Sequence, residues 1–484
     1  MSRENFNIKQ LYSDLVTFEE ENNLFKKKIQ GVLVWERIRF TVYRLILEDN
    51  TVTNVDVAQG KKLSTSTILR NYLTKLKNYL LSIISFKQNP FLAKEHDIVI
   101  ISHPRRKIQP DGKWWDIYTD HFSNDLKYST LTLEGDNTLF YYKPPKTKNI
   151  RYFSFVYFLV KLKKLFGIGK VKLNNDEVEY LNFLSDEIYK KFGSKIDIRS
   201  KVEVRLSIRA RILPLFIKVL ERIKPKVVLI ICSYGKEDFI EACKIKNIPV
   251  IELQHGVISK YHLGYSFESK GARKYTFPDY LFVFGDYWKK SVKFPIEQNK
   301  IISVGFPELE KKKEFYSNIQ KKNQILFISQ ITVGEKLSKL AIELSKDNSI
   351  DYHIVYKLHP RESKKWAELY PHLKNSKIEI ISQEKNLYQL FAESKILVGV
   401  YSTAIYEGLN FGLKVFLLDS PGIEHVENLI EQGFAQKITN LADLKEQINN
   451  PLEKKIDYNY FFESDSIENI KKKIYEIIDL HYSL

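Results

Sequence analysis

The sequence contains little sulfur: two Cys and one Met occur among its 484 residues. Cys232 and Cys243 do not have the spacing of metal ligands, and two cysteines are too few for a disulfide framework. No cluster of His and Cys suggests a structural metal either. The simplest compartment for such a chain is therefore a reducing cytoplasm.

Long apolar runs are missing as well. No segment offers about 18 uninterrupted apolar residues, so we expect no transmembrane helix. The nearest candidate, residues 152–169, is interrupted by Lys161, Lys163 and Lys164. The polar N-terminus lacks the apolar core of a signal peptide. The GxGxxG and P-loop consensus sequences are also absent, which argues against a standard dehydrogenase or ATPase.

Basic residues are abundant, and the formal net charge is +17. Zinc-finger spacing, RNA-binding signatures and heptads beside a basic region are all missing, so we expect no nucleic-acid partner. Two lysine-rich aliphatic segments, 67–88 and 152–172, have the pattern of basic amphipathic helices. Such helices can lie on an anionic membrane surface, and the alternative is that they are ordinary surface helices.

The chain is too long for one ordinary core, and 44% of its residues are hydrophobic, so we expect two large globular domains. Strand and helix patterns alternate before a lysine-rich break and again after it. This alternation predicts an α/β fold of two doubly wound, Rossmann-like domains that face each other across a cleft. We place an N-terminal domain with a helical extension at 1–307, a linker at 308–323, a second domain at 324–465, and a terminal helix at 466–484 that packs back on the first domain.

Ligands of doubly wound domains bind at the carboxyl ends of the parallel strands. One predicted strand stops at Gln254, His255 and Gly256, where glycine permits a tight turn. His255 therefore stands at a strand end, with a near-neutral pKa that suits proton transfer or phosphate binding. A purely structural histidine in the turn is the alternative.

A second strand, "YHIVYKLHP", stops at Pro360, which cannot donate to a strand ladder. Lys357, His359 and Arg361 alternate along the extended chain, so they can point to one side and form an anion site. Arg361 could instead pair with Glu362, and Lys357 could be partly buried structure. His359 is the strongest candidate of the three.

A third strand is followed by Ser402 and Thr403 at the start of a helix. Either hydroxyl can cap the helix, and the exposed N–H groups of a helix N-terminus bind phosphate well. Glu407 lies one residue too far from Thr403 for a capping box, which leaves it available to hold a ribose diol. An ordinary capped helix with a solvent-facing Glu407 is the alternative.

The first half offers weaker candidates. "SHPRR" at 102–106 repeats the pattern of a strand that ends in His-Pro and arginines, and it contributes Arg105 to the expected cleft. Asp116 and Asp120 stand close to two tryptophans, and a carboxylate beside aromatic rings can act as a general base. Two solvated loop acids are the alternative.

Three stretches together resemble bacterial surface-polysaccharide glycosyltransferases of the GT-B fold: Gln-His-Gly at 254–256, "KLHPRE" at 357–362 and "YSTAIYEGLNFGLKVFLLD" at 401–419. The His-Pro motif followed by a Ser/Thr pair is similar to that of sialyl-, polysialyl- and Kdo transferases and of CDP-glycerol glycerophosphotransferases. These enzymes use cytidine-nucleotide donors. The resemblance covers roughly residues 225–425.

The resemblance implies that His359 contacts the donor phosphate and that Ser402 and Thr403 bind the same phosphate or the nucleotide. Glu407 would hold the ribose. The second domain would thus bind the nucleotide donor, and the first would face the acceptor.

The resemblance also implies that Gln254 and His255 lie across the cleft, near the donor sugar or the acceptor. The pair of acids followed by glycine that supplies the base in sialyltransferases is not evident in the first half. Asp116, Asp120 and His255 therefore remain rival candidates for the base.

The function implied is that of a metal-independent glycosyltransferase, without a cofactor, in capsule or lipopolysaccharide synthesis. It would move a CMP-linked acidic sugar such as sialic acid or Kdo to a glycan acceptor, free or lipid-linked, in the cytoplasm or at the inner face of the inner membrane. The alternatives are a CDP-polyol phosphotransferase and a UDP- or dTDP-hexose glycosyltransferase. A non-catalytic scaffold, a nucleic-acid binder and a non-hydrolysing epimerase are the rivals from other classes.

Overall fold

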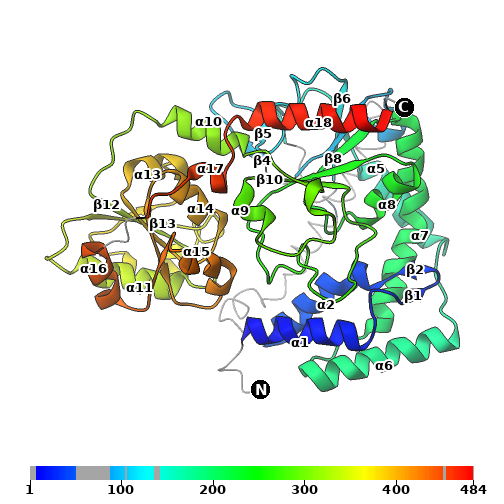
Figure 1. Cartoon of the computed structure of the whole chain (residues 1–484), viewed down its shortest axis with the longest axis horizontal. Coiled ribbons are helices and arrows are strands. Elements are labelled where there is room, and N and C mark those ends of the chain that lie inside the picture. Colours follow the sequence, from blue (N-terminus) through cyan, green and yellow to red (C-terminus); the bar gives the residue numbers. More distant parts are fainter. Residues whose placement is uncertain are drawn as a thin grey trace.

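Two parallel sheets, one in each half of the chain, organise the molecule (Figure 1). The structure is a computed structural model that describes residues 7–50, 73, 88–103, 106–135, 142–450 and 454–482. Each sheet lies between layers of helices, as the alternating pattern predicts. The predicted fold class of two doubly wound domains is confirmed.

The sheet of the N-terminal half has the strand order β11-β10-β9-β8-β3-β6-β7, with every pair parallel. Its strands are β3 (Ile98–Ile101), β6 (Thr130–Glu134), β7 (Ile150–Tyr152), β8 (Val227–Ile231), β9 (Val250–Leu253), β10 (Tyr280–Val283) and β11 (Ile301–Ser303). The order reverses between β3 and β8, which makes the carboxyl ends of these two strands a topological switch point.

The sheet of the C-terminal half has the order β14-β13-β12-β15-β16-β17 and is also parallel throughout. Its strands are β12 (Gln324–Ile328), β13 (His353–Lys357), β14 (Glu379–Ile381), β15 (Ile396–Gly399), β16 (Lys414–Leu418) and β17 (Gln436–Ile438). Its switch point lies between β12 and β15. Two antiparallel pairs complete the strands: β1 (Lys28–Ile29) with β2 (Val32–Leu33), and β4 (Arg106–Ile108) with β5 (Trp114–Asp116).

Helices cover both faces of each sheet. Those of the N-terminal half are α1 (Ile8–Glu21), α2 (Trp35–Asn50), α5 (Ser154–Leu165), α6 (Asn175–Phe192), α7 (Ile198–Ile223), α8 (Glu237–Ile245) and α9 (Asp286–Lys289), with the 3-10 turns η3 (Pro90–Leu92) and η4 (Gln298–Lys300). Those of the C-terminal half are α11 (Gly334–Ser345), α12 (Trp366–Leu369), α13 (Leu387–Glu393), α14 (Thr403–Asn410), α15 (Glu427–Glu431), α16 (Leu441–Asn449) and α17 (Tyr458–Phe461), with η5 (Pro371–Leu373) and η6 (Ile423–Val426).

Alternate residues of each strand supply two separate cores. Val99 and Ile101 of β3 belong to the core cluster of α5, α7 and α8, while Ile98 and Ile100 belong to the cluster on the opposite face. That second cluster continues into the C-terminal half, where it includes Leu397 of β15. One continuous apolar cluster therefore joins the two halves.

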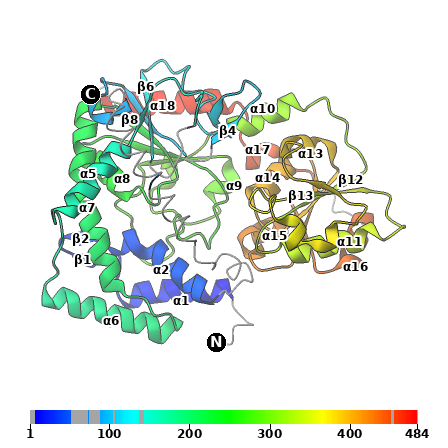
Figure 2. The ribbon, with the colours of Figure 1, turned by 180° about the vertical axis from the view of Figure 1, so that it is seen from behind.

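The last helix, α18 (Ser466–Tyr482), crosses the N-terminal half, as its red ribbon beside green and cyan elements shows in Figures 1 and 2. Ile470, Ile474, Ile477 and Ile478 are buried at helical spacing and form its apolar face. Tyr475 accepts a hydrogen bond from the backbone N–H of Lys127 at 2.9 Å. The C-terminus is thereby fixed to the first domain.

The segment 308–323, for which we predict a linker, contains most of a helix, α10 (Pro307–Phe315). Pro307 occupies the first helical turn, where its missing N–H costs nothing. The Glu310 carboxylate accepts hydrogen bonds from the backbone N–H groups of Asp465 and Ser466, both at 3.0 Å. The connection between the domains is thus tied to the start of α18.

Of the two lysine-rich segments, 67–88 lies outside the described residues apart from Leu73 and Gln88. The other forms α5, which ends in an exposed apolar stretch. Leu165 is 79% exposed, and Phe166 and Ile168 are also exposed. No helix in the described ranges is long and apolar enough to cross a membrane.

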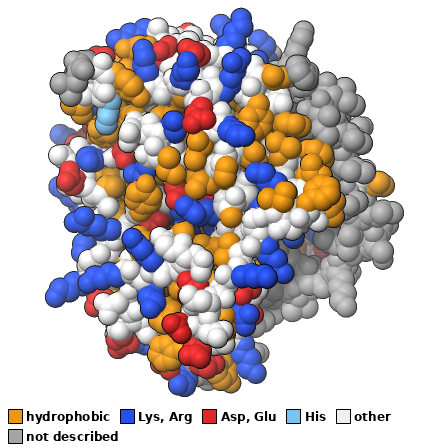
Figure 3. Space-filling view, turned by 90° about the vertical axis from the view of Figure 1, so that its right-hand side faces the viewer, with side chains coloured by type: hydrophobic (Ala, Val, Ile, Leu, Met, Phe, Trp, Pro, Cys, Tyr) orange, Lys and Arg blue, Asp and Glu red, His pale blue; other side chains and the backbone are white. Residues whose placement is uncertain are grey.

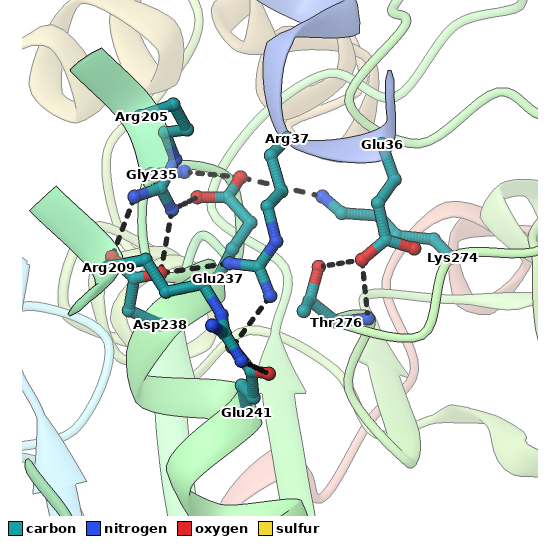
Figure 4. Close-up of polar contacts among 10 residues, drawn as sticks. All are labelled: Glu36, Arg37, Arg205, Arg209, Gly235, Glu237, Asp238, Glu241, Lys274 and Thr276. Atoms are coloured by element: carbon teal, nitrogen blue, oxygen red, sulfur yellow. Dashed lines mark hydrogen bonds and ion pairs between the residues drawn. The ribbon is translucent and has the colours of Figure 1, made fainter. Parts of the chain in front are cut away.

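A buried ion network fastens the helical extension to the first Rossmann-like domain (Figure 4). Arg37 of α2 donates to Asp238 at 2.8 Å and to Glu241 at 2.7 Å, both on α8. Arg205 of α7 pairs with Asp238 at 2.6 Å, and Arg209 pairs with Glu241 at 2.6 Å. The side chain of Arg37 is 2% exposed. Without Arg37, Asp238 keeps Arg205 and Glu241 keeps Arg209, but each buried carboxylate loses one charged hydrogen bond, worth about 1.5–3 kcal/mol.

We therefore expect Arg37→Ala to lower the free energy of unfolding by about 3–5 kcal/mol. Arg44→Ala on the same helix is the matched control, because Arg44 pairs with Glu48 at 3.2 Å while both side chains are more than half exposed. That change should cost less than about 1 kcal/mol. Urea unfolding of the full chain measures both, and equal costs for the two variants would contradict the account.

Candidate active site

The predicted strand-end motifs of the two domains face each other. A Cβ built on Gly256, after β9, would lie 3.5 Å from Oγ1 of Thr403 at the start of α14. Close by, the Ser259 hydroxyl lies 2.6 Å from Nδ1 of His425. The carboxyl ends of β9 and β15 therefore meet across the domain boundary, as expected for ligands bound between two such domains.

His255 lies in a shell of aromatic side chains. The Tyr234 hydroxyl is 3.1 Å from its Nε2, and the Tyr265 hydroxyl is 3.3 Å from its Nδ1. Tyr118 donates to the His255 carbonyl oxygen at 2.8 Å, and the His103 ring stacks on the His255 ring at 5.7 Å. The imidazole is thus fixed in position at the strand end.

The partners of Tyr265 select the tautomer of His255. Tyr265 donates its hydroxyl proton to Glu252, which is fully buried in β9. The Tyr265 oxygen can then accept from the N–H at Nδ1 of His255, which leaves Nε2 as the basic nitrogen. His255 is therefore poised to accept a proton at Nε2, next to the Tyr234 hydroxyl.

Gln254 shapes the turn that carries His255. It is 2% exposed; its amide donates to the Gly256 carbonyl at 2.8 Å, and its oxygen accepts from the Phe284 N–H at 2.8 Å. Both ends of the side chain are thus committed to backbone groups, and Gln254 positions its neighbour.

In the second domain, Ser402 is the N-cap residue of α14 in an extended conformation, and no side chain caps the helix there. The first N–H groups of a helix have no intrahelical acceptor. The first turn of α14 contains no acidic residue. This helix end is therefore an electrostatically favourable place for a phosphate.

The equivalent helix end in the first domain is occupied. α8 begins after β8 with Glu237 and Asp238, and Glu237 accepts from the Gly235 N–H at 3.0 Å (Figure 4). Arg37 and Arg205 pair with Asp238. The chain's own carboxylates fill this position, so a phosphate would meet two negative charges there.

His359 follows β13 and has a defined tautomer. Its Nδ1 accepts from the Arg361 N–H at 3.2 Å, which places the proton of the neutral ring on Nε2. Its backbone N–H donates to Glu362 at 2.8 Å, and Glu362 also accepts from Tyr370 at 2.8 Å. Glu362 is buried and is engaged by these groups; no ion pair with the exposed Arg361 occurs in this described loop.

Lys357, at the end of β13, is half-buried, and its ammonium group donates to the Ser382 carbonyl. Burial lowers its pKa. The ammonium also lies 3.4 Å from the Lys385 carbonyl. Lys357 thus holds the loop after β14, while His359 and Arg361 stand nearer the end of the motif.

Glu407 is not the solvent-facing residue of the alternative interpretation. It is 8% exposed, and burial raises the pKa of its carboxyl to about 7 against the opposing effects of Lys107 and Tyr388. Lys107 comes from the β4–β5 hairpin of the first domain. Glu308 also acts on the Glu407 carboxyl, which therefore lies where the two domains meet.

Asp116 and Asp120 are not solvated loop acids. Asp116 is 0% exposed and accepts from the N–H groups of Tyr118 at 3.0 Å and His103 at 3.1 Å. Burial raises its pKa to about 6. Asp120 accepts from the Asp116 N–H at 2.7 Å and from Thr147 at 2.7 Å. Asp116 thus holds the backbone of His103, and Asp120 holds the backbone of Asp116, so both carboxylates fix the chain that follows β3. Arg105 lies outside the described residues.

Of the residues around His255, sequence reasoning noted only His103, in the weaker motif "SHPRR", and it did not single out Tyr118, Tyr234, Glu252 and Tyr265. For two of them a signal existed. His103 and Tyr234 follow the strands β3 and β8, whose carboxyl ends form the switch point. The other three are brought in by tertiary packing.

Residues 228–413 match the family described as CDP-Glycerol:Poly(glycerophosphate) glycerophosphotransferase. The match spans less than half of the 484 residues, yet it includes the Gln-His-Gly turn, the His-Pro motif and the start of α14. It marks the chain as an enzyme of the transferase class. No curated protein matches the chain.

Several solved structures are similar to this chain. The UDP-GlcNAc 2-epimerase from Methanocaldococcus jannaschii is 14% identical, with 78% of this chain and 99% of that one covered and a TM-score of 0.45. The corresponding epimerase from Neisseria meningitidis bound to UDP-GlcNAc is 15% identical, with coverages of 79% and 98% and a TM-score of 0.44. A glycosyltransferase from Rickettsia africae is 15% identical, with coverages of 80% and 99% and a TM-score of 0.41.

The Glu407 carboxyl gives a testable pH dependence. Its folded-state pKa, about 7, lies above the ordinary 4.5, so the folded chain binds the proton more tightly. The stabilising contribution is fully present below pH 4.5 and is lost as pH rises through 7. We expect this loss to reach about 3 kcal/mol.

Glu407→Gln should therefore match the natural chain in stability at pH 4 and exceed it at pH 8, as measured by unfolding across this range. Glu335→Gln is the control, because Lys339 lowers the pKa of that carboxyl and the change should not improve stability at pH 8. Parallel stability profiles for the natural chain and Glu407→Gln would contradict the assignment.

Proposed function

We propose that this enzyme releases CMP from a cytidine-nucleotide donor and transfers the activated group to a hydroxyl of a glycan acceptor. The observation that carries the proposal is the approach of the His255 turn to the N-terminus of α14, with Gly256 and Thr403 in near contact. The residue that we propose as the base and the helix end that we propose for the phosphate thereby lie on opposite sides of one boundary. The matched transferase domain includes both.

The donor phosphate would bind at the first N–H groups of α14, with the hydroxyls of Ser402 and Thr403 beside it. His359 would donate its Nε2 proton to a phosphate oxygen and stabilise the charge that develops as CMP leaves. Arg361 adds a positive charge at the same strand end. These groups can offset the phosphate charge, and we infer that no metal or other cofactor is required.

His255 would act as the base. As the acceptor oxygen forms its new bond, the hydroxyl proton moves to Nε2 of His255, while the bond from the transferred group to the CMP oxygen breaks and its electron pair leaves with CMP. Glu407 would hold the ribose hydroxyls. Asp116 and Asp120, the earlier rivals for the base, would serve to order His103.

Two donor classes share this leaving group. With a CDP-polyol the acceptor oxygen attacks the outer phosphorus, and with a CMP-linked acidic sugar it attacks the sugar carbon. The family match favours the CDP-polyol. The resemblance of the His-Pro motif to sialyl- and Kdo transferases favours the acidic sugar. A UDP- or dTDP-hexose donor would release a different nucleotide.

We further propose that the enzyme works at the inner face of the membrane in the synthesis of capsule or another surface glycan. Leu165 and Phe166 are exposed at the end of α5, and the exposed Lys161 and Lys164 flank them. This combination suits an anionic lipid surface.

His359→Ala should lower CMP release by about 10²-fold or more, because one donor to the leaving phosphate is lost. His353→Ala is the matched control on the same strand. That ring is 51% exposed, pairs with Glu379 at 2.7 Å and stands at the opposite end of β13. It should keep the natural rate. Chromatographic detection of the released nucleotide, CMP from CDP-glycerol, CDP-ribitol, CMP-sialic acid or CMP-Kdo and UDP from UDP-GlcNAc, each supplied in turn, measures both variants.

Full activity of His359→Ala with an intact fold would overturn the role of this histidine. Nucleotide release confined to UDP-GlcNAc would overturn the cytidine donor. If none of the donors in the panel releases a nucleotide, the result would favour the alternative of a non-catalytic scaffold.

A further inference from the structure

A cavity of about 590 Å³ lies within the first domain, between α2, α5, α7 and the carboxyl ends of β3, β6 and β8. It is separate from the start of α14, where the donor phosphate is proposed to bind. Its position is the switch point of the first sheet, where doubly wound domains hold ligands. The family match begins at residue 228, so the helices and β-strands that supply most of the lining precede the matched domain.

One end of the cavity is polar and adjoins the proposed base. Ser102, His103, Glu134 and Tyr234 line this end. His103 stacks on the His255 ring at 5.7 Å, and the Tyr234 hydroxyl is 3.1 Å from His255 Nε2. A hydroxyl group held at this end would lie beside His103 and Tyr234, the two side chains that contact the His255 ring.

This end also contains a buried oxygen that no described group satisfies. Glu134 is 5% exposed; its Oε1 accepts from Arg106, while its Oε2 has no hydrogen-bond partner among the described residues. A buried carboxylate oxygen without a partner is costly. The oxygen is buried behind the cavity wall.

Another part of the lining is apolar. It consists of Phe153, which precedes α5, Tyr157 of α5, and Ile208, Ile212 and Phe216 of α7. Ile212 and Phe216 are buried, whereas Ile208 is 38% exposed and marks the outer edge. The apolar side thus leads from the core of the domain to the surface of α7.

The surface beyond this edge is rich in apolar and basic side chains. α5 lies along α7, where the Arg211 guanidinium donates to the Ile168 carbonyl at 2.8 Å. Figure 3 looks at the side of the molecule on which α5, α7 and α8 lie, and it shows hydrophobic side chains interspersed with Lys and Arg. Leu165 and Phe166 are among the exposed ones.

The floor of the cavity is rigid. Arg37, Arg205 and Asp238 line it and belong to the buried ion network of Figure 4. Nε of Arg37 is buried and has no hydrogen-bond partner in the described chain. A floor fixed by paired charges keeps its shape without an occupant.

We propose that this cavity binds the acceptor, and that the acceptor is amphipathic: its hydroxyl-bearing end lies at His103, Glu134 and Tyr234, and its apolar chain runs along α7 past Ile208. This inference rests on the proposed function, because His255 gives the polar end its role. The cavity accounts for one feature that donor binding does not use, the apolar lining that opens at the surface of α7.

The test uses the full chain and the amphipathic glycoside n-dodecyl β-maltoside below its critical micelle concentration. Calorimetry should show saturable binding, with maltose at least about tenfold weaker because it lacks the apolar chain. Ile208→Glu should weaken binding by about tenfold or more, since the carboxylate must be desolvated against the alkyl chain. Val204→Glu, one turn away on α7 and 56% exposed, is the matched control outside the cavity and should leave affinity unchanged.

Saturable binding that only Ile208→Glu weakens supports the cavity. No saturable binding, or equal losses in the two variants, overturns it, because the second result indicates adsorption to the surface of α7. The readout does not depend on transfer. If no cytidine donor in the panel releases CMP while the cavity still binds the glycoside, the proposed function fails and the binding site stands.

Discussion

The positive N-terminal ends of two helices determine which domain can bind the donor phosphate. In both domains a helix begins just after a central parallel strand, where its unsatisfied N–H groups attract negative charge. In the first domain the chain supplies that charge itself, through Glu237 and Asp238 at the start of α8. In the second domain α14 has no acid in its first turn and no side-chain cap. The donor phosphate therefore belongs to the second domain in our account.

The ion pairs that neutralise the acids at the start of α8 also shape the first domain. Because Arg37 and Arg205 must reach Asp238, α2 and α7 are drawn onto α8, and the space left between them and the strand ends becomes the cavity. The continuous apolar cluster and the aromatic junction, where Trp288 of α9 meets Tyr406 of α14 with ring centroids 4.5 Å apart, then hold the two domains face to face. The His255 turn is placed opposite α14 as a result.

The sequence predicts those parts of this arrangement that depend on local patterns. Alternating strands and helices indicate two parallel sheets, and the polar residues after a strand must gather at one edge, so the turn at Gly256 and the start of α14 could be foreseen. Burial could not. The sequence left open whether Asp116 is a solvated loop acid and whether Glu407 faces solvent, yet both are enclosed by elements distant in the chain. The cavity likewise needs α2, α5 and α7 together, and no local pattern specifies such a meeting.

The most direct test of the central claim is a crystal structure of the full chain with CDP, the nucleotide portion of a CDP-polyol donor. The account predicts that a phosphate group lies within hydrogen-bond distance of the N–H groups of Thr403 and Ala404, with His359 beside it and the acceptor cavity of the first domain unoccupied by nucleotide. A phosphate bound in the first domain near α8, with the start of α14 empty, would contradict it.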